Sequence, residues 1–263
     1  MRCLHDQGIE GRLVVVRDRG RARAVALLER AGSRWFLWKG PAGGNPSSEV
    51  LQAILSRCAD LASVTLVLQP EWAFGSPLHS AGFSEGAPFS TLLVPTAGAD
   101  AQILARMAPA TRGRVRRGMR AGLQFAEDAT RLKGYYTIYE AAMDAAASPD
   151  FATLGELESV LGTPDVHLFV ALMGDDIAAG SVCFEHQDSV EARYVATSAS
   201  HRPLGPLNFL HFESIRWAAQ RGRAYLDLSG WASETADAKT SNINRFKEGF
   251  GGARRDYPVF TRE

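Results

Sequence analysis

A lysine near the C-terminal end of the chain lies between two phenylalanines, in the segment Phe246-Lys247-Glu248-Gly249-Phe250-Gly251-Gly252. A lysine held between aromatic side chains is rigid and partly desolvated, which suits it to stabilise developing negative charge or to orient a phosphate-bearing substrate. The same spacing is typical of a helix that ends in a basic turn and a glycine stop. Spacing alone favours the structural interpretation, so the choice depends on the rest of the chain.

A second concentration of charge lies between residues 111 and 120. Five arginines fall within nine residues there, with no acidic residue among them: Arg112, Arg114, Arg116, Arg117 and Arg120. On a helix, Arg112, Arg116 and Arg120 repeat every four residues and share one side. Such a cluster fits two interpretations equally well: contact with phosphates or RNA, and a solvated basic face that is paired with Glu127 and Asp128 elsewhere on the surface.

Composition limits the other kinds of function. Lys and Arg balance Asp and Glu at 29 each, so any contact with nucleic acid must come from local patches. The six histidines are scattered, and no spacing of His, Cys and Asp indicates a metal site. Cys3, Cys58 and Cys183 are widely spaced and are expected to be reduced thiols. With no signal peptide and no apolar run of the ~18 to 20 residues that a membrane span needs, the sequence predicts a soluble, cytoplasmic protein.

Two modules are predicted to position these residues. In the first, short apolar runs separated by turns predict strands at residues 13–16, 24–28, 35–38 and 64–68, and an amphipathic helix at 50–58. A further strand is expected at 91–94. The second module is predicted to contain helices at 135–143, 154–161 and 207–220 and strands at 167–172, 178–184, 190–197 and 224–228. Strands, a helix at a bend and another strand are the plan of an acyltransferase core.

The turn before the helix at 207–220 resembles a phosphate-binding turn. In the GNAT acetyltransferases this turn reads Arg/Gln-x-x-Gly-x-Gly/Ala, and its backbone N–H groups hold a pyrophosphate at a helix N-terminus. Here Arg202 and Gly205 match, but Pro206 has no N–H and Leu207 replaces the small residue. The turn therefore resembles a GNAT turn whose pyrophosphate cradle has lapsed.

Taken together, the motifs resemble the Fem-type (FemABX-like) aminoacyl-tRNA-dependent transferases, and the resemblance covers most of the chain. The segment 246–251 matches the Phe-Lys-x-Gly-Phe-Gly signature of that family, which is the specific motif. The weaker matches are the arginine-rich segment within 104–123, Trp38-Lys39-Gly40-Pro41, Arg193-Tyr194-Val195-Ala196 and Tyr225-Leu226-Asp227-Leu228-Ser229-Gly230.

The resemblance implies an α/β (α+β) fold of two tandem GNAT-like acyltransferase domains, with mixed, mainly antiparallel sheets flanked by helices. We expect an N-terminal domain at residues 1–126 and a C-terminal domain at 127–254, with the tail 255–263 packing back onto the first. The implied reaction moves an amino acid from aminoacyl-tRNA onto an amine. Its mechanism consists mainly of placing the amine against an activated ester and stabilising the oxyanion.

The resemblance also implies roles for individual residues. Lys247 is assigned to the acceptor end of the tRNA and to the charge formed there, and Phe246 to the positioning of Lys247. Arg245, Arg254, Arg255 and Arg202 are predicted to contact tRNA. Tyr194, Lys39, Arg112 and Arg116 are predicted to bind the acceptor in a cleft between the modules. Aminoacyl-tRNA is expected as co-substrate, without another cofactor, metal or membrane span.

Departures from the family pattern leave the acceptor open. Pro95 stands where the family commonly has an acidic residue, and Ser148-Pro149-Asp150-Phe151 lacks an arginine that is common in members acting on nucleotide-linked peptidoglycan precursors. A peptidoglycan precursor, a small peptide and an amine-bearing natural product all fit. Two other functions stay as alternatives. A CoA-dependent GNAT N-acyltransferase is disfavoured by Pro206 and Leu207, and a non-catalytic RNA- or peptide-binding protein is disfavoured by the intact motif at 246–251.

Overall fold

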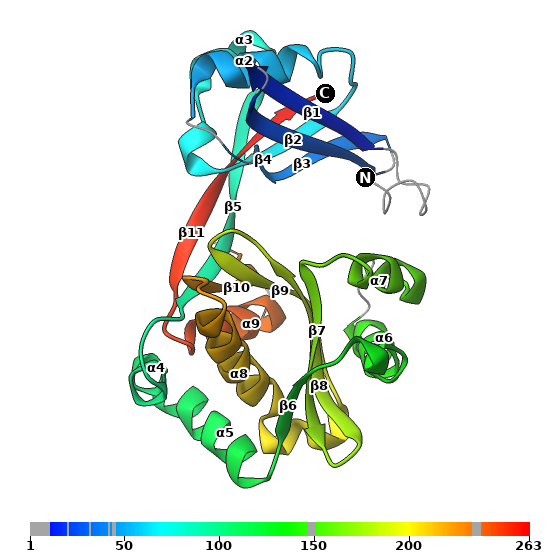
Figure 1. Ribbon diagram of the computed structural model, residues 1–263, viewed down its shortest axis with the longest axis vertical. Helices are drawn as coiled ribbons and strands as arrows, with labels where there is room; N and C mark the ends of the chain where they lie inside the picture. Colours follow the sequence, from blue (N-terminus) through cyan, green and yellow to red (C-terminus); the bar gives the residue numbers. More distant parts are fainter. Residues whose placement is uncertain are drawn as a thin grey trace. The chain divides into compact units, whose positions relative to one another are not determined.

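The computed structural model describes residues 11–19, 21–31, 33–41, 43, 46–146, 151–232 and 238–263. The chain divides into two compact units (Figure 1), one comprising Met1–Ser90 with Asp256–Glu263 and the other Thr91–Arg255. Cys3 and residues 148–150 of the segment Ser148-Pro149-Asp150-Phe151 lie outside the described residues. Each unit is built from one part of the strand and helix pattern expected from the sequence.

The first unit is a sheet with short helices. Its elements are β1 (Gly11–Asp18), β2 (Arg21–Ala31), β3 (Arg34–Gly40), α2 (Ser48–Ser56), β4 (Val64–Leu68), the 3-10 turn η1 (Pro70–Trp72), α3 (Gly75–Ser80), and the parts of β5 (Ser84–Pro95) and β11 (Ala253–Arg262) that belong to this unit. β1, β2 and β3 pair in an antiparallel meander, β3 pairs in parallel with β4, and β4 pairs antiparallel with β11. The strands and the helix expected in residues 13–68 are therefore all present.

Local sequence explains α2. The side chain of Ser47 accepts a hydrogen bond from the backbone N–H of Val50 at 3.2 Å and caps the helix. Leu51, Ile54 and Leu55 are spaced to share one face, and all three are buried in the core of this unit.

The second unit is a six-stranded sheet with helices on both faces. Its elements are α4 (Asp100–Arg106), α5 (Pro109–Arg120), β6 (Gln124–Glu127), η2 (Ala129–Arg131), α6 (Leu132–Ala146), α7 (Leu154–Leu161), β7 (Val166–Met173), β8 (Asp176–Glu185), β9 (Ser189–Thr197), η3 (Ala199–Leu204), α8 (Pro206–Gln220), β10 (Tyr225–Gly230) and α9 (Ala238–Glu248). The strand order is β5-β10-β9-β8-β7-β6, parallel between β10 and β9 and antiparallel between all the other neighbouring strands. The expected mixed, mainly antiparallel sheet is confirmed.

Two hydrophobic cores fill the two faces of this sheet. One core contains Phe209, Phe212 and Ile215 of α8, Val115 of α5 and Phe250, which follows α9. The other gathers residues of α6 and α7, which lie across β7 and β8 from α8 (Figure 1). The face on which a residue lies therefore decides whether it can approach Lys247.

The boundary between the units differs from the expected division at residue 126. β5 enters the second unit at Thr91, and its residues 91–95 pair with β10. α5 packs on α8, where Val115 is fully buried and a Cβ added to Gly118 would lie 2.8 Å from Cβ of Phe209. Residues 91–126 thus contribute to the core of the second unit, and the tail from Asp256 onward lies with the first unit through β11.

Membrane-spanning helices, metal-binding clusters and reactive thiols were sought among the described residues. Among the described residues, no helix is long and apolar enough to cross a membrane. In the same part of the chain, no group of three or more His, Cys, Asp or Glu side chains could hold a metal ion. Cys58 and Cys183 are buried free thiols, and burial raises the pKa of Cys183 to about 12, so this thiol is not a ready nucleophile.

Candidate active site

Lys247 lies in the last turn of α9 and faces the end of β10. Its Nζ donates hydrogen bonds to the carbonyl oxygen of Ser229 at 3.2 Å and to the carbonyl oxygen of Gly230. Burial lowers the pKa of Lys247 to about 8, against the opposing attraction of Asp227 and Glu191. The ammonium group is therefore largely charged at neutral pH, partly desolvated and fixed in direction.

Two buried carboxylates lie close to this lysine. Asp227 is 3% exposed and Glu191 is 2% exposed. Oδ1 of Asp227 accepts hydrogen bonds from the hydroxyl of Thr91 and from the backbone N–H of Ser229 at 2.7 Å. Oε1 of Glu191 accepts a hydrogen bond from the hydroxyl of Ser229 at 3.2 Å. Buried charges need such partners, and here the partners also orient the backbone that Lys247 contacts.

Ser229 is held in an unusual backbone conformation. Its φ angle is +57°, in the left-handed region that residues other than glycine seldom adopt. The hydrogen bond from its N–H to Asp227 and the bond from its hydroxyl to Glu191 hold it there. The bent end of β10 presents two successive carbonyl oxygens to Lys247.

Aromatic rings line the α8 side of α9. Phe246 packs edge to face on Phe250, with ring centroids 5.4 Å apart, and both rings contact His211 of α8. His211 is 3% exposed, and its Nδ1 has no hydrogen-bond partner among the described residues. Burial, together with the nearby charge of Lys247, lowers the pKa of His211 to about 3. The imidazole is therefore neutral at physiological pH and belongs to an apolar wall behind Phe246.

Gly249 and Gly251, two of the three glycines that follow Lys247, allow a close approach of α4 and α5. A Cβ at Gly249 would collide with the hydroxyl of Thr111, and one at Gly251 would collide with the carbonyl oxygen of Arg106. The backbone N–H of Ala108 donates to the carbonyl oxygen of Gly249 at 2.9 Å. The glycines in the motif are thus required by packing, and that packing joins the end of α9 to the start of α5.

Asn244 anchors α9 one turn before Lys247. Its Nδ2 donates to the carbonyl oxygen of Ala232 at 2.8 Å, and the N–H of Ala232 donates back to Oδ1 at 3.4 Å. Because Ala232 follows β10 closely, the same segment is held at both Gly230 and Ala232. Lys247 therefore points at a fixed backbone target.

The depressed pKa predicts a pH dependence. If protonated Lys247 stabilises the oxyanion, the single-turnover rate of acyl transfer should fall as pH rises through about 8, with an acceptor whose amine is already neutral at pH 7. The free energy of unfolding should change in the opposite direction and rise with pH. Between about pH 8 and the ordinary lysine value of 10.5 the unfolded chain binds a proton that the folded chain lacks, so Lys247 makes stability rise with pH.

Both effects can be measured against the variant Lys247→Met. Comparing urea denaturation of the two proteins at pH 7.5, 9 and 10 isolates the contribution of this one group. An unchanged difference in unfolding free energy across that range would show that the pKa of Lys247 is not depressed.

The arginines predicted to contact tRNA lie on segments around Lys247 and on η3. Arg245 is exposed on α9, and its Nη1 donates to Oδ1 of Asn242 at 3.4 Å. The guanidinium of Arg254 stacks over the ring of Trp231 at 4.9 Å, next to Gly230. Arg255 is half-buried and Arg202 is exposed on η3. Arg245 and Arg254 therefore flank the Lys247 segment.

The residues predicted to bind the acceptor are not gathered in one place. Arg112 is half-buried, and its Nη1 donates to the carbonyl oxygen of Leu104 at 3.4 Å, while Arg116 is exposed. Lys39 belongs to the first unit, where its Nζ lies over the rings of Phe89 and Tyr257 at 5.7 Å and 5.2 Å. Arg112 alone adjoins a residue, Thr111, that packs on the segment after Lys247.

Tyr194 packs on the opposite face of the sheet from Phe246. Val182 pairs with Tyr194 and Cys183 with Ala192, so Arg193 is an extra residue that forms a β-bulge. The bulge places Ala192 in the core with α8 and Tyr194 in the core with α6, where its ring meets that of Tyr139 at 6.2 Å. The structure therefore does not bring Tyr194 together with Lys247.

The turn before α8 is covered by α5. Gly205 has a φ angle of +71°, and a Cβ there would lie 3.0 Å from the carbonyl oxygen of Arg114. Nη1 of Arg117 donates to the carbonyl oxygen of Pro203 at 3.0 Å. Gly205 and Pro206 are both buried, and Pro206 occupies the first turn of the helix, so it offers no N–H. The backbone of α5 therefore packs against the turn that would hold a pyrophosphate.

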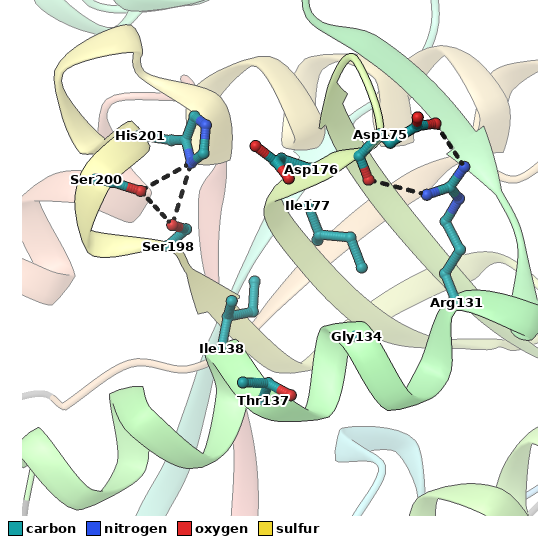
Figure 2. A pocket seen from close by; sticks show the side chains of 10 residues that line it. All are labelled: Arg131, Gly134, Thr137, Ile138, Asp175, Asp176, Ile177, Ser198, Ser200 and His201. Atoms are coloured by element: carbon teal, nitrogen blue, oxygen red, sulfur yellow. Dashed lines mark hydrogen bonds and ion pairs between the residues drawn. The ribbon is translucent and has the colours of Figure 1, made fainter.

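A separate depression of about 600 Å³ lies beside α6 and the turn between β7 and β8 (Figure 2). In it, His201 Nδ1 lies 3.1 Å from both Ser198 Oγ and Ser200 Oγ, and Arg131 pairs with Asp175. These groups satisfy one another, and the lining includes none of the residues predicted for the site. The lining residues are Arg131, Gly134, Thr137, Ile138, Asp175, Asp176, Ile177, Ser198, Ser200 and His201.

Sequence reasoning did not identify Asp227, Glu191, Ser229 or His211 as parts of the site. A signal was present for the two carboxylates, because each interrupts an apolar strand and acidic side chains are seldom buried without a purpose. Asp227 lies within the motif at residues 225–230, but the sequence does not indicate which residue it contacts. For Ser229 the decisive feature is its backbone angle, which has no sequence signature in a residue other than glycine.

The chain is similar in sequence to one protein family and in fold to several solved structures. Residues 109–247 match the model of the acetyltransferase (GNAT) domain family. No curated protein matches the sequence. The crystal structure of FemX matches with a TM-score of 0.82 and 13% identity, over 98% of this chain and 89% of FemX.

Two further solved structures share the fold. The C-terminal domain of a putative lysylphosphatidylglycerol synthetase from Agrobacterium fabrum matches with a TM-score of 0.68 and 15% identity, over 96% of this chain and 84% of that one. L-PGS from Bacillus licheniformis matches with a TM-score of 0.68 and 12% identity, over 99% and 90%. These likenesses confirm the expected Fem-type fold of tandem GNAT-like domains.

Proposed function

We propose that this chain, an acyltransferase that belongs to the acetyltransferase (GNAT) domain family, moves an amino acid from aminoacyl-tRNA onto an amine of a peptide acceptor. The transfer forms an amide bond. The observation that carries the proposal is the directed charge of Lys247. An ammonium group has three N–H donors. Among the described residues, the ammonium group of Lys247 donates to two acceptors, the carbonyl oxygens of Ser229 and Gly230. The third remains for a substrate oxygen.

The chemistry needs little else from the protein. A neutral acceptor amine attacks the ester carbonyl, and the carbonyl oxygen becomes an oxyanion that the third N–H of Lys247 stabilises. The bond from carbon to the ribose oxygen then breaks, and a proton passes from the attacking nitrogen to that oxygen. Because the ester is already activated, we propose that no cofactor is required beyond this co-substrate.

The covered turn before α8 favours tRNA over CoA as the donor. A pyrophosphate at a helix N-terminus needs free backbone N–H groups and space. Pro206 lacks an N–H, and Gly205 lies against the backbone of Arg114. CoA would have to bind without the contacts that usually anchor it, whereas a tRNA ester needs none of them.

The remaining roles are proposed from position. Phe246 keeps Lys247 in place through its contacts with Phe250 and His211. Arg245, Arg254 and Arg255 bind tRNA phosphates near the esterified end. Arg112 and Arg116 bind the acceptor, while the acceptor roles of Tyr194 and Lys39 stay predictions. A tRNA donor also implies that the reaction takes place in the cytoplasm.

The acceptor amine is proposed only as a class. A peptidoglycan precursor and a smaller peptide or natural product both supply the nucleophile that the mechanism needs. The structural neighbours include proteins named as lysylphosphatidylglycerol synthetases, so a lipid hydroxyl is a useful comparison acceptor.

Donor substitution tests the proposal. Purified protein is incubated with a mixture of peptide amines and either total aminoacylated tRNA carrying labelled amino acids or labelled acetyl-CoA. We expect labelled amide product from charged tRNA, loss of that product when the tRNA is digested with ribonuclease beforehand, and no product from acetyl-CoA. Turnover with acetyl-CoA but not with charged tRNA would identify a CoA-dependent N-acyltransferase instead.

A further inference from the structure

The exposed side of α5 carries positive charge that none of the described carboxylates neutralises. Thr111, Val115 and Gly118 are buried against α8 and the segment after α9, so the opposite side of the helix faces solvent. Arg120 lies opposite this buried stripe, Arg117 lies on its flank and Arg114 lies at its edge, and all three side chains are exposed. Within the described part of the chain, none of these three arginines forms an ion pair with a carboxylate.

Arg202 extends this charged surface from the neighbouring element η3. It is exposed, and Pro203, the next residue, accepts a hydrogen bond from Arg117. Gly205 lies against the backbone of Arg114. Arg202 likewise forms no ion pair with a described carboxylate. Besides Arg116, α5 and η3 therefore present four exposed arginines, Arg114, Arg117, Arg120 and Arg202, which we call the arginine surface.

Four other arginines of the second unit are paired with carboxylates, unlike those of the arginine surface. Arg131 contacts Asp128 and Asp175, Arg216 contacts Asp100 and Glu213, and Glu185 accepts from both Arg221 and Arg223. In a chain with no net charge, a cluster of unpaired guanidinium groups concentrates positive potential in one place. This potential attracts anions from solution.

The shape of α5 selects a nucleic acid over a membrane. A helix that lies on a bilayer inserts an apolar face between the lipids. The apolar stripe of α5 is already buried, and Met119, at 38% exposed, is its one large apolar side chain that reaches solvent. Guanidinium groups spaced along a helix of 12 residues, about 18 Å long, fit successive phosphates of a duplex.

We propose that the arginine surface, Arg114, Arg117, Arg120 and Arg202, binds backbone phosphates of a double-helical RNA stem; this inference rests on the proposed tRNA-dependent function. The packing of Thr111 on Gly249 places the start of α5 beside the Lys247 segment. Arg120 lies nine residues further on, about 14 Å along the helix axis. A stem whose esterified end reaches Lys247 therefore passes along α5, and recognition is by backbone and shape.

Salt-dependent binding of uncharged total tRNA tests this surface without requiring catalysis. The triple variant Arg114→Gln, Arg117→Gln, Arg120→Gln should bind at least about tenfold more weakly than wild type at ~0.1 M salt. The slope of log affinity against log salt should be shallower by about 2 to 3, since each lost phosphate contact removes about 0.7 to 0.9. A triple lysine variant should recover most of the slope, and Arg131→Gln, which removes a paired arginine, should bind like wild type.

The outcomes separate the two proposals. Wild-type affinity and slope in a folded triple glutamine variant would overturn the arginine surface, as would tighter binding of wild type to vesicles of anionic lipid than to tRNA at the same salt. If the triple variant does not fold, Arg114→Gln and Arg120→Gln are measured singly, and a slope change of about 1 for each is expected. Loss of binding in these variants, with no amide formed from charged tRNA by wild type, would uphold the surface and reject the proposed function.

Discussion

Replacing Lys247 with methionine is expected to lower the rate of amide formation by about 100- to 1,000-fold, the usual effect of removing one donor that stabilises an oxyanion. Methionine keeps much of the length and apolar contact of the lysine stem but has no N–H to offer. The fold should survive, because burial already disfavours the charged amine and lowers its pKa to about 8. Single-turnover transfer from charged tRNA measures the rate, and urea denaturation at pH 7 measures stability.

Two controls make the loss specific to the site. Lys133→Met removes an exposed lysine from α6 and should leave the rate unchanged. Binding of uncharged tRNA by Lys247→Met should stay close to that of wild type, because the arginine surface remains. Transfer at the wild-type rate in a folded Lys247→Met protein would remove Lys247 from the mechanism.

Replacing Gly251 with alanine is expected to destabilise the protein by about 3 kcal/mol or more, as the sum of left-handed backbone strain and forced overpacking. Its φ angle is +76°, and a Cβ there would collide with the backbone carbonyl oxygen of Arg106. Backbone cannot swing aside as a flexible side chain can. The turn that joins α9 to β11 must therefore shift, and Lys247 must shift with it.

Gly122→Ala is a matched control. Gly122 also has a left-handed conformation, with a φ angle of +82°, but no atom lies within 4 Å of an added Cβ. Its substitution should cost only about 1 to 2 kcal/mol, from the backbone term alone. Denaturant titration of both variants measures the difference, and equal losses of stability would show that the approach of α4 to Gly251 does not constrain the motif.

Local features of the fold could be predicted because their causes are local. The cap at Ser47, the apolar face of α2 and the strands at 13–68 all follow from residue type and spacing. The division into units followed from contacts between distant segments. Thr91 pairs with Gly230, and Val115 packs against α8. The residues next to Thr91 and Val115 in the sequence form no pattern that indicates either contact.

The site shows the same limit. Lys247 and Phe246 could be selected because they stand in a specific motif. Ser229, with its left-handed backbone, could not, because the conformation depends on hydrogen bonds to Asp227 and Glu191, the latter from β9. Tyr194 was assigned to the acceptor, but a single bulged residue, Arg193, turns its side chain to the other face of the sheet.

One measurement tests most directly whether charged Lys247 serves aminoacyl-tRNA. Enzyme in excess is mixed with tRNA carrying a labelled amino acid and with a peptide amine, and the label is followed as ester, free amino acid and amide in a single turnover. We predict that wild type moves the label from ester to amide much faster than the ester hydrolyses, and that Lys247→Met leaves it on the tRNA. Label that stays on the tRNA with wild-type enzyme, while an acyl-CoA acylates the same amine, would contradict the account.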